Sequence, residues 1–265
     1  MATGGTEHAL HHSAGDTREG LSLDSRGFVL SLIDAPSSTG VAGRLQFQIH
    51  RETGEPLIQF TKAHEKDLHL IVVRTDGSHF RHVHPGLDPS TGIWSVPWIW
   101  EEAGTYRIYA DFTPADAEAG EVTLSRTVEV AGDYRPTRAT ARATDEVGGF
   151  TLELEGDLVA GAPSELTVSI ARDGEPVTSL QPYLGAFGHL VALREGDLAY
   201  LHIHAEGESP ENGQSTAGPT ITFAAIAPTI GRYLLYLDFQ VDGGVHTATF
   251  VLDAHHRPAT DQVAG

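Results

Sequence analysis

The sequence predicts an all-β fold of two tandem β-sandwich domains, immunoglobulin-like or cupredoxin-like, that arose by internal duplication. Matching residues recur at a nearly constant spacing along the chain. Short runs rich in Val, Ile, Leu and aromatic residues alternate with Gly, Pro, Asp and Asn, and no segment sustains the apolar period of 3.6 residues that marks an amphipathic helix. About seven or eight such runs in roughly 105 residues are typical of a sandwich domain.

The duplication is visible in two sets of matching segments. Residues 54–56 (GEP) recur at 174–176, an offset of 120, and residues 109–112 (YADF) recur as 236–239 (YLDF), an offset of 127. The second repeat therefore contains an insertion, which we place in a polar loop. The predicted organisation is a flexible, histidine-containing segment at 1–25, repeat 1 at 26–132, a linker at 133–146, repeat 2 at 147–254 and a C-terminal tail at 255–265.

Composition and charge exclude several classes of protein. The 265 residues include 36 Asp and Glu against 17 Lys and Arg, a net charge of −19, which argues against binding nucleic acid or an anionic membrane surface. No apolar stretch approaches the ~18 residues of a membrane-spanning helix, and the first residues lack the pattern of a secretory signal. There is no Cys, and the one Met is Met1, so thiolate and thioether metal sites are excluded. The unusual residue type is His, which occurs 15 times.

One β-hairpin of repeat 1 brings three histidines together. Asp76-Gly77 is a preferred pair for a two-residue type I′ turn. With this pair at the tip, His69 opposes His84, and His82 lies two residues from His84 on the same strand face. Because directly opposed Cβ atoms lie ~4.5–5.5 Å apart, we expect the three imidazoles to converge at the open end of the hairpin.

The second repeat has the same arrangement around a different turn. Gly196-Asp197 matches the preference of a type II′ turn for Gly in first position. The resulting register opposes His189 to His204 and places His202 on the same face. The sequence therefore predicts a three-histidine cluster in each repeat.

Three imidazoles at this spacing suit a divalent transition metal. Each can place a nitrogen ~2.0–2.1 Å from one ion, and thiolate-free imidazole sites favour Zn(II), Cu(II) or Ni(II). We predict that each cluster binds Cu(II) or Zn(II). Less certain ligands, in addition to water, are His64, Asp111, Asp238 and His246.

Two alternative functions remain open. The histidines can be structural, held by carboxylates and titrating near neutral pH, in a metal-free adhesion or interaction module. A small metalloenzyme would need an open coordination position inside a cleft. The chain has no Gly-rich phosphate loop, no H-E-x-x-H and no G-x-S-x-G motif, so we expect no catalytic activity.

The histidine segments also resemble a known group of proteins. Residues 64–73 (HEKDLHLIVV) followed by 82–85 (HVHP) resemble a motif of bacterial exported proteins, and 182–190 (PYLGAFGHL) followed by 201–204 (LHIH) is similar to a motif of the same group. The resemblance covers most of both repeats. It implies tandem immunoglobulin/cupredoxin-like domains that lie outside the cytoplasm and are associated with heavy-metal, chiefly copper, handling.

Two departures from that group stand out. His204 is followed by Ala205, whereas His84 is followed by Pro85. Members of the group usually carry an export signal or anchor, a pattern that we do not find in this sequence. Together, residues and resemblance predict an extracytoplasmic protein that serves metal buffering, delivery or resistance. Its expected partners are the metal ion and a metal-transport or membrane-anchored protein.

Overall fold

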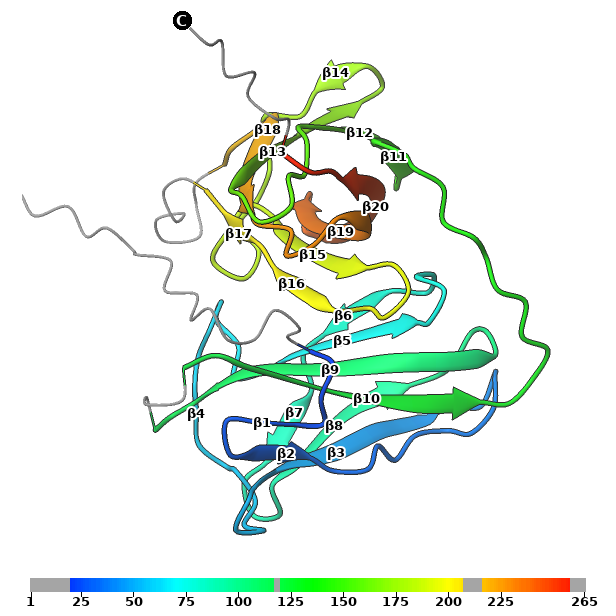
Figure 1. Ribbon diagram of the computed structural model, residues 1–265, viewed down its shortest axis with the longest axis vertical. Coiled ribbons are helices and arrows are strands. Elements are labelled where there is room, and N and C mark those ends of the chain that lie inside the picture. Colours follow the sequence, from blue (N-terminus) through cyan, green and yellow to red (C-terminus); the bar gives the residue numbers. More distant parts are fainter. Residues whose placement is uncertain (1–19, 117–119, 207–215, 258–265) are drawn as a thin grey trace, which may run out of the picture.

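The computed structural model describes residues 20–116, 120–206 and 216–257, with the backbone alone at His202 and His204. Across these ranges the regular secondary structure consists of β-strands, which confirms the predicted all-β class (Figure 1). No helix in the described ranges is long and apolar enough to cross a membrane.

Repeat 1 is a sandwich of two antiparallel sheets. Its outer sheet has the order β1 (Asp24–Ser25), β2 (Phe28–Leu30), β3 (Gly43–Arg51), β8 (Ile93–Trp98) and β7 (Gly86–Asp88). Its second sheet, here called an interface sheet, has the order β10 (Val122–Val130), β9 (Gly104–Pro114), β5 (His69–Arg74) and β6 (Arg81–Val83), with β4 (Phe60–Thr61) also paired to β9.

Repeat 2 has the same two-sheet plan. Its outer sheet has the order β11 (Thr144–Val147), β12 (Phe150–Glu155), β13 (Ser164–Arg172), β18 (Thr220–Ala225) and β17 (His204–Ala205), with β14 (Glu175–Pro176) also paired to β13. Its interface sheet has the order β16 (Tyr200–His202), β15 (His189–Arg194), β19 (Gly231–Val241) and β20 (Gly244–Ala254).

The interface sheets are buried on both faces. Leu70 and Val72 of β5 belong to the core of the repeat 1 sandwich. Ile71 and Val73 of the same strand are just as buried, although their side chains point the other way because successive residues of a strand alternate in direction. They form a separate apolar cluster with residues of repeat 2, including Leu193. The two sandwiches therefore pack face to face through β5, β9, β15 and β19 (Figure 1).

The contacts between the repeats are reciprocal. The hydroxyl of Tyr109 in β9 donates a hydrogen bond to the Leu198 carbonyl in the second hairpin. The hydroxyl of Tyr236, the corresponding residue of β19, donates to the Gly77 carbonyl in the first hairpin at 2.6 Å. Phe80 stacks on the Tyr236 ring with centroids 3.9 Å apart. Because each repeat gives the other the same kind of contact, the interface has approximate twofold symmetry.

Over the residues that pair, both hairpins have the predicted register. In repeat 1, Ile71 pairs with His82, and in repeat 2, Val191 pairs with His202. The ladders end there or one residue further, at Leu70 and Val83 in repeat 1. The strand faces that carry the histidines are consequently those that face the other repeat.

The predicted type I′ turn at Asp76-Gly77 is wrong. The Gly77 amide donates to the Arg74 carbonyl, so Thr75 and Asp76 are the central residues, and the left-handed φ of 82° is at Gly77. The Asp76 carboxylate accepts hydrogen bonds from the Arg74 guanidinium and from the amide and hydroxyl of Ser78. These side-chain bonds favour the observed turn. A second left-handed residue, His79 at φ 53°, adds one residue after the turn, so that Ile71 still pairs with His82 as predicted.

The predicted type II′ turn of repeat 2 is also wrong. The Leu198 amide donates to the Arg194 carbonyl, one residue further back than a two-residue turn at Gly196-Asp197 allows. Left-handed φ values occur at Gly196 (104°) and Leu198 (55°). As in repeat 1, an Asp of the turn, Asp197, binds the preceding arginine through its carboxylate. Both turns thus share an ion pair between the last arginine of the first strand and an aspartate of the turn.

Gly77 leaves no room for a side chain at the interface. A Cβ atom there would lie 2.2 Å from Leu234 Cδ1 of repeat 2. At Gly54 the φ of 89° is similar, but no heavy atom lies within 4 Å of the corresponding Cβ. We expect Gly77→Ala to lower the free energy of unfolding by about 1–3 kcal/mol more than Gly54→Ala, because only the former overpacks the interface. Urea denaturation measures this difference, and equal losses in the two variants would contradict the packing explanation.

Candidate metal centre

His69 is the central histidine of the cluster. It begins β5 and is buried, with 7% of its surface exposed. Its Nε2–H donates a hydrogen bond to the Ala63 carbonyl at 3.0 Å, because a carbonyl oxygen can only accept. In the neutral ring this leaves Nδ1 without a hydrogen and free to act as a ligand.

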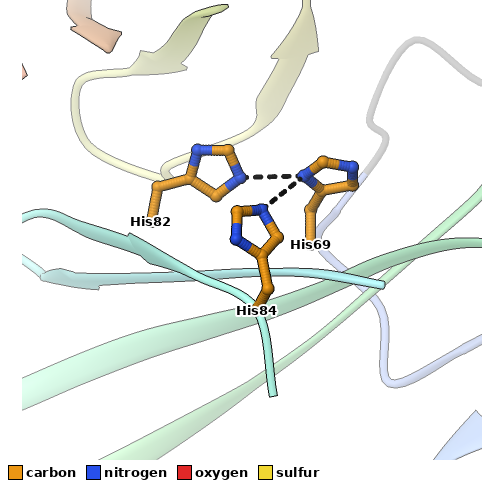
Figure 2. Close-up of side chains that lie close together, drawn as sticks. All are labelled: His69, His82 and His84. Carbon is orange, nitrogen blue, oxygen red and sulfur yellow. Dashed lines mark hydrogen bonds between the residues drawn. The ribbon is translucent and has the colours of Figure 1, made fainter. Parts of the chain in front are cut away.

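His82 and His84 direct their Nε2 atoms at this same nitrogen. His82 Nε2 lies 2.9 Å from His69 Nδ1, and His84 Nε2 lies 3.1 Å from it (Figure 2). His82 is the middle residue of β6 and pairs with Ile71, whereas His84 lies one residue beyond β6 and still reaches His69. The predicted convergence of the three imidazoles in repeat 1 is thus present.

The spacing of the three rings matches shared coordination of one ion. Ligand nitrogens about 2.0–2.1 Å from a tetrahedral ion lie about 3.3 Å apart, and their ring centroids lie about 5.2 Å apart. The observed centroid distances are 5.2 Å between His69 and His82, 4.9 Å between His69 and His84, and 4.9 Å between His82 and His84. One potential ligand atom from each residue lies within 4.8 Å of the other two. The two nitrogen separations at His69 Nδ1, 2.9 Å to His82 Nε2 and 3.1 Å to His84 Nε2, are within a few tenths of an ångström of the separation expected around one ion.

The hydrogen bonds of His69 to Ala63 and of His82 to Asp238 determine which nitrogen of each ring lacks a hydrogen and faces the centre of the cluster. His82 Nδ1 lies 2.7 Å from Asp238 Oδ2, and both side chains are about 95% buried. When that Nδ1–H donates to the carboxylate, Nε2 of the neutral ring bears only a lone pair. His69 Nδ1 and His82 Nε2 then face each other as two lone pairs at 2.9 Å, an arrangement that a hydrogen or a metal ion between the two nitrogens relieves.

Burial keeps the neighbouring imidazoles neutral. Loss of solvation, reinforced by His82, lowers the pKa of His69 to about 3. The same causes, with Lys66 and His189 contributing, lower the pKa of His84 to about 3. At neutral pH both rings are therefore in the form that binds a metal.

His189 reproduces part of this arrangement in repeat 2. Its Nε2–H donates to the Tyr183 carbonyl at 2.8 Å, which corresponds to the bond from His69 to Ala63. Burial and the nearby His64 lower the pKa of His189 to about 4. A hydrogen bond from Nε2–H to a backbone carbonyl thus orients one histidine in each repeat.

The opposition predicted between His189 and His204 is not present in the backbone. The ladder of β15 and β16 ends at Val191 and His202, whereas His204 pairs with Ala224 in the outer sheet. The chain changes sheets between these histidines, which a simple hairpin extrapolation does not anticipate. The side chains of His202 and His204 lie outside the described part of the structure, so their role as ligands stays a prediction.

The less certain candidates have different surroundings. Asp238 supports His82 and also accepts a hydrogen bond from Thr247 Oγ1 at 2.6 Å. Asp111 is buried, pairs with His69 across β5 and β9, and accepts a hydrogen bond from Thr123 Oγ1 at 2.9 Å. Both aspartates thus lie beside the histidines, and Asp238 supports a ring instead of adding a ligand.

Of the two remaining candidates, His64 lies beside the histidine cluster and His246 does not. The His64 ring contacts His69, with centroids 6.0 Å apart, and His189 of repeat 2, at 5.0 Å. The His246 ring packs on Phe150 and Phe239 at 4.9 and 5.4 Å. His246 follows Val245 and precedes Thr247, whose hydroxyl binds Asp238, so its side chain points to the other face of β20. The structure places His246 away from the cluster.

Sequence reasoning missed the supporting groups from outside the hairpins. The carbonyls of Ala63 and Tyr183 have no signature in residue type. Ala63 and Tyr183 each lie six residues before the histidine that they bind, and each begins a tight turn. In the sequence, only the offset of 120 marks them as equivalent. The position of Asp238 beside a histidine of the other repeat depends on how the sandwiches pack.

Comparison with protein families finds the same duplication. A family model described as a domain of unknown function (DUF8832) matches residues 24–132 and again residues 145–256. No curated protein matches the chain significantly.

Solved structures resemble the chain at low sequence identity. A DUF4426 family protein from Pseudomonas aeruginosa PAO1 has 9% identity and a TM-score of 0.33, covering 44% of this chain and 99% of that one. The Escherichia coli adhesin FdeC has 14% identity and a TM-score of 0.26, covering 88% and 66% respectively. The D0-D1 domain of intimin has 11% identity and a TM-score of 0.24, covering 85% and 96%. With the family model matching most of its length in two copies, the chain belongs to the DUF8832 family.

Proposed function

We propose that the protein binds a divalent transition metal, Cu(II) or Zn(II), through His69 Nδ1, His82 Nε2 and His84 Nε2. The observation that carries this proposal is the pair of inward nitrogens 2.9 Å apart whose outer nitrogens are already engaged by Ala63 and Asp238. Metal-ligating histidines usually donate their second N–H to a carbonyl or carboxylate in this way.

The site would act by ligation alone. Neutral imidazoles take up the ion, and acid releases it by protonating them. The proposed role is metal buffering, delivery or resistance outside the cytoplasm, with a metal-transport or membrane-anchored partner, and it draws on the resemblance of residues 64–73 and 82–85 to exported proteins associated with heavy-metal handling. We propose no catalytic step.

Calorimetric titration of chelator-stripped full-length protein with Zn(II) and with Cu(II) tests this function. We expect His69→Ala to lose at least one tight equivalent that the wild type binds. His50→Ile is the matched control, because His50 lies in the outer sheet and Ile170 is the residue at the same position of repeat 2. The terminal histidines are the same in all three proteins, so their binding cancels in the comparison.

Equal binding by His69→Ala and His50→Ile would contradict the proposed function. The cluster would then be held by hydrogen bonds alone, between His69 and His82 and between His82 and Asp238. In that case the protein would be a metal-free adhesion or interaction module with structural histidines.

A further inference from the structure

His64 and His189 form a second pair of imidazoles next to the first cluster. Their ring centroids are 5.0 Å apart with an interplanar angle of 83°. His64 belongs to repeat 1 and His189 to repeat 2, so the pair spans the interface. His64 also lies 6.0 Å from His69, centroid to centroid, which joins the pair to the first cluster.

We propose that His64 and His189 bind a second transition-metal ion, so that the two repeats share a two-ion histidine centre. The proposal rests on the function proposed above and extends it to a site made by both repeats. The separation of 5.0 Å falls within the range of 4.9–5.2 Å found among the rings of His69, His82 and His84.

The hydrogen bond of His189 prepares it for this role. Its Nε2–H is engaged by the Tyr183 carbonyl, so Nδ1 of the neutral ring has a free lone pair, as in His69. His69 and His189 therefore occupy equivalent positions in the two repeats, and in each the Nε2–H is held by a backbone carbonyl.

A tight turn presents His64 to the other repeat. Ala63 and Lys66 exchange two backbone hydrogen bonds, and the central residues His64 and Glu65 have left-handed φ values of 47° and 65°. Such values cost energy in residues other than Gly.

The corresponding turn of repeat 2 joins Tyr183 and Ala186 and has the same backbone conformation. Leu184 there has φ 55° and Gly185 has φ 74°. A leucine therefore fits where repeat 1 has His64, which means that this backbone does not require an imidazole. The turn in repeat 1 thus carries a metal-ligating side chain that its own conformation does not need.

Buried carboxylates offset the charge that two ions would bring. Asp111 pairs with His69 across the interface sheet of repeat 1, and Asp238 pairs with His189 across that of repeat 2. Both are nearly inaccessible, with 4% and 3% of their surface exposed. Both carboxylates therefore lie beside the proposed two-ion centre, Asp111 opposite His69, and Asp238 opposite His189 and in contact with His82, where low polarity strengthens the attraction between a carboxylate and a cation.

Cu(II) binding to the full-length chain, followed by calorimetry and electron paramagnetic resonance, tests the second site. We expect His64→Leu to bind one equivalent fewer than the wild type. The wild type loaded to saturation should show dipolar coupling between two nearby Cu(II) ions, and His64→Leu should show the spectrum of isolated ions. Leucine is chosen because Leu184 occupies the same turn position in repeat 2, and His50→Ile again serves as the control.

The outcomes separate the two proposals. Loss of one equivalent and of the coupling in His64→Leu, with His50→Ile unchanged, supports the shared centre. Unchanged stoichiometry and coupling in His64→Leu overturn the second site, while loss of an equivalent in His69→Ala would leave the first one standing. Equal binding by His69→Ala, His64→Leu and the control overturns both.

Discussion

Asp238→Asn is expected to weaken metal binding at His69, His82 and His84 by about 10- to 100-fold, although Asp238 belongs to the other repeat. The carboxylate accepts the Nδ1–H of His82 at 2.7 Å and so keeps Nε2 free to bind the ion. An asparagine that turned its NH₂ group toward His82 would favour the opposite tautomer, with hydrogen on Nε2. Even with its oxygen toward His82, it would remove the negative charge that strengthens the imidazole as a ligand.

Competition titration with a metal-binding dye of known affinity measures this effect. Asp253→Asn is the control, because Asp253 is also in repeat 2 but forms a more exposed ion pair with Arg232. The circular dichroism spectrum of each variant checks the fold. Equal affinities for Asp238→Asn and Asp253→Asn would show that the contact between the repeats does not support the metal site.

Acid is expected to destabilise the metal-free protein through the buried histidines. The pKa values of His69 and His189 in the folded protein are about 3 and about 4, below the usual 6.5. The unfolded chain therefore binds more protons between these limits, and the free energy of unfolding falls as the pH drops below about 6.5. Each of the two residues should remove about 2 kcal/mol by pH 5.

Urea denaturation with chelator present, at pH 7 and at pH 5, tests this expectation. In His189→Gln the loss between these two pH values should be smaller than in the wild type by about 2 kcal/mol, because glutamine does not titrate. Comparing each protein with itself at two pH values removes the cost of the substitution at neutral pH. His50→Ile should retain the loss seen in the wild type. An equal loss in His189→Gln and wild type would refute the contribution of His189.

The repeats and the hairpin registers could be predicted because they depend on local information. The offset of 120 fixes the correspondence of the histidines, and the alternation of side chains along a strand fixes which of them share a face. For this reason the convergence of His69, His82 and His84 followed from the sequence even though both turns were predicted wrongly. In each hairpin a second left-handed residue, His79 or Leu198, compensates for the difference.

The packing of the repeats could not be predicted from such patterns. A strand buried on both faces, such as β5, gives the same apolar run whether the second face meets another sheet of its own domain or another domain. The sequence therefore predicted two separate clusters. In the structure, Asp238 and His189 of repeat 2 lie next to the histidines of repeat 1.

Anomalous diffraction from crystals of the zinc-loaded protein tests the central claim most directly. Data collected above and below the zinc absorption edge locate each bound ion without assuming its ligands. We expect a peak about 2.0–2.1 Å from His69 Nδ1, His82 Nε2 and His84 Nε2. Zinc found only at other positions, with His82 Nε2 still in contact with His69 Nδ1, would contradict the account.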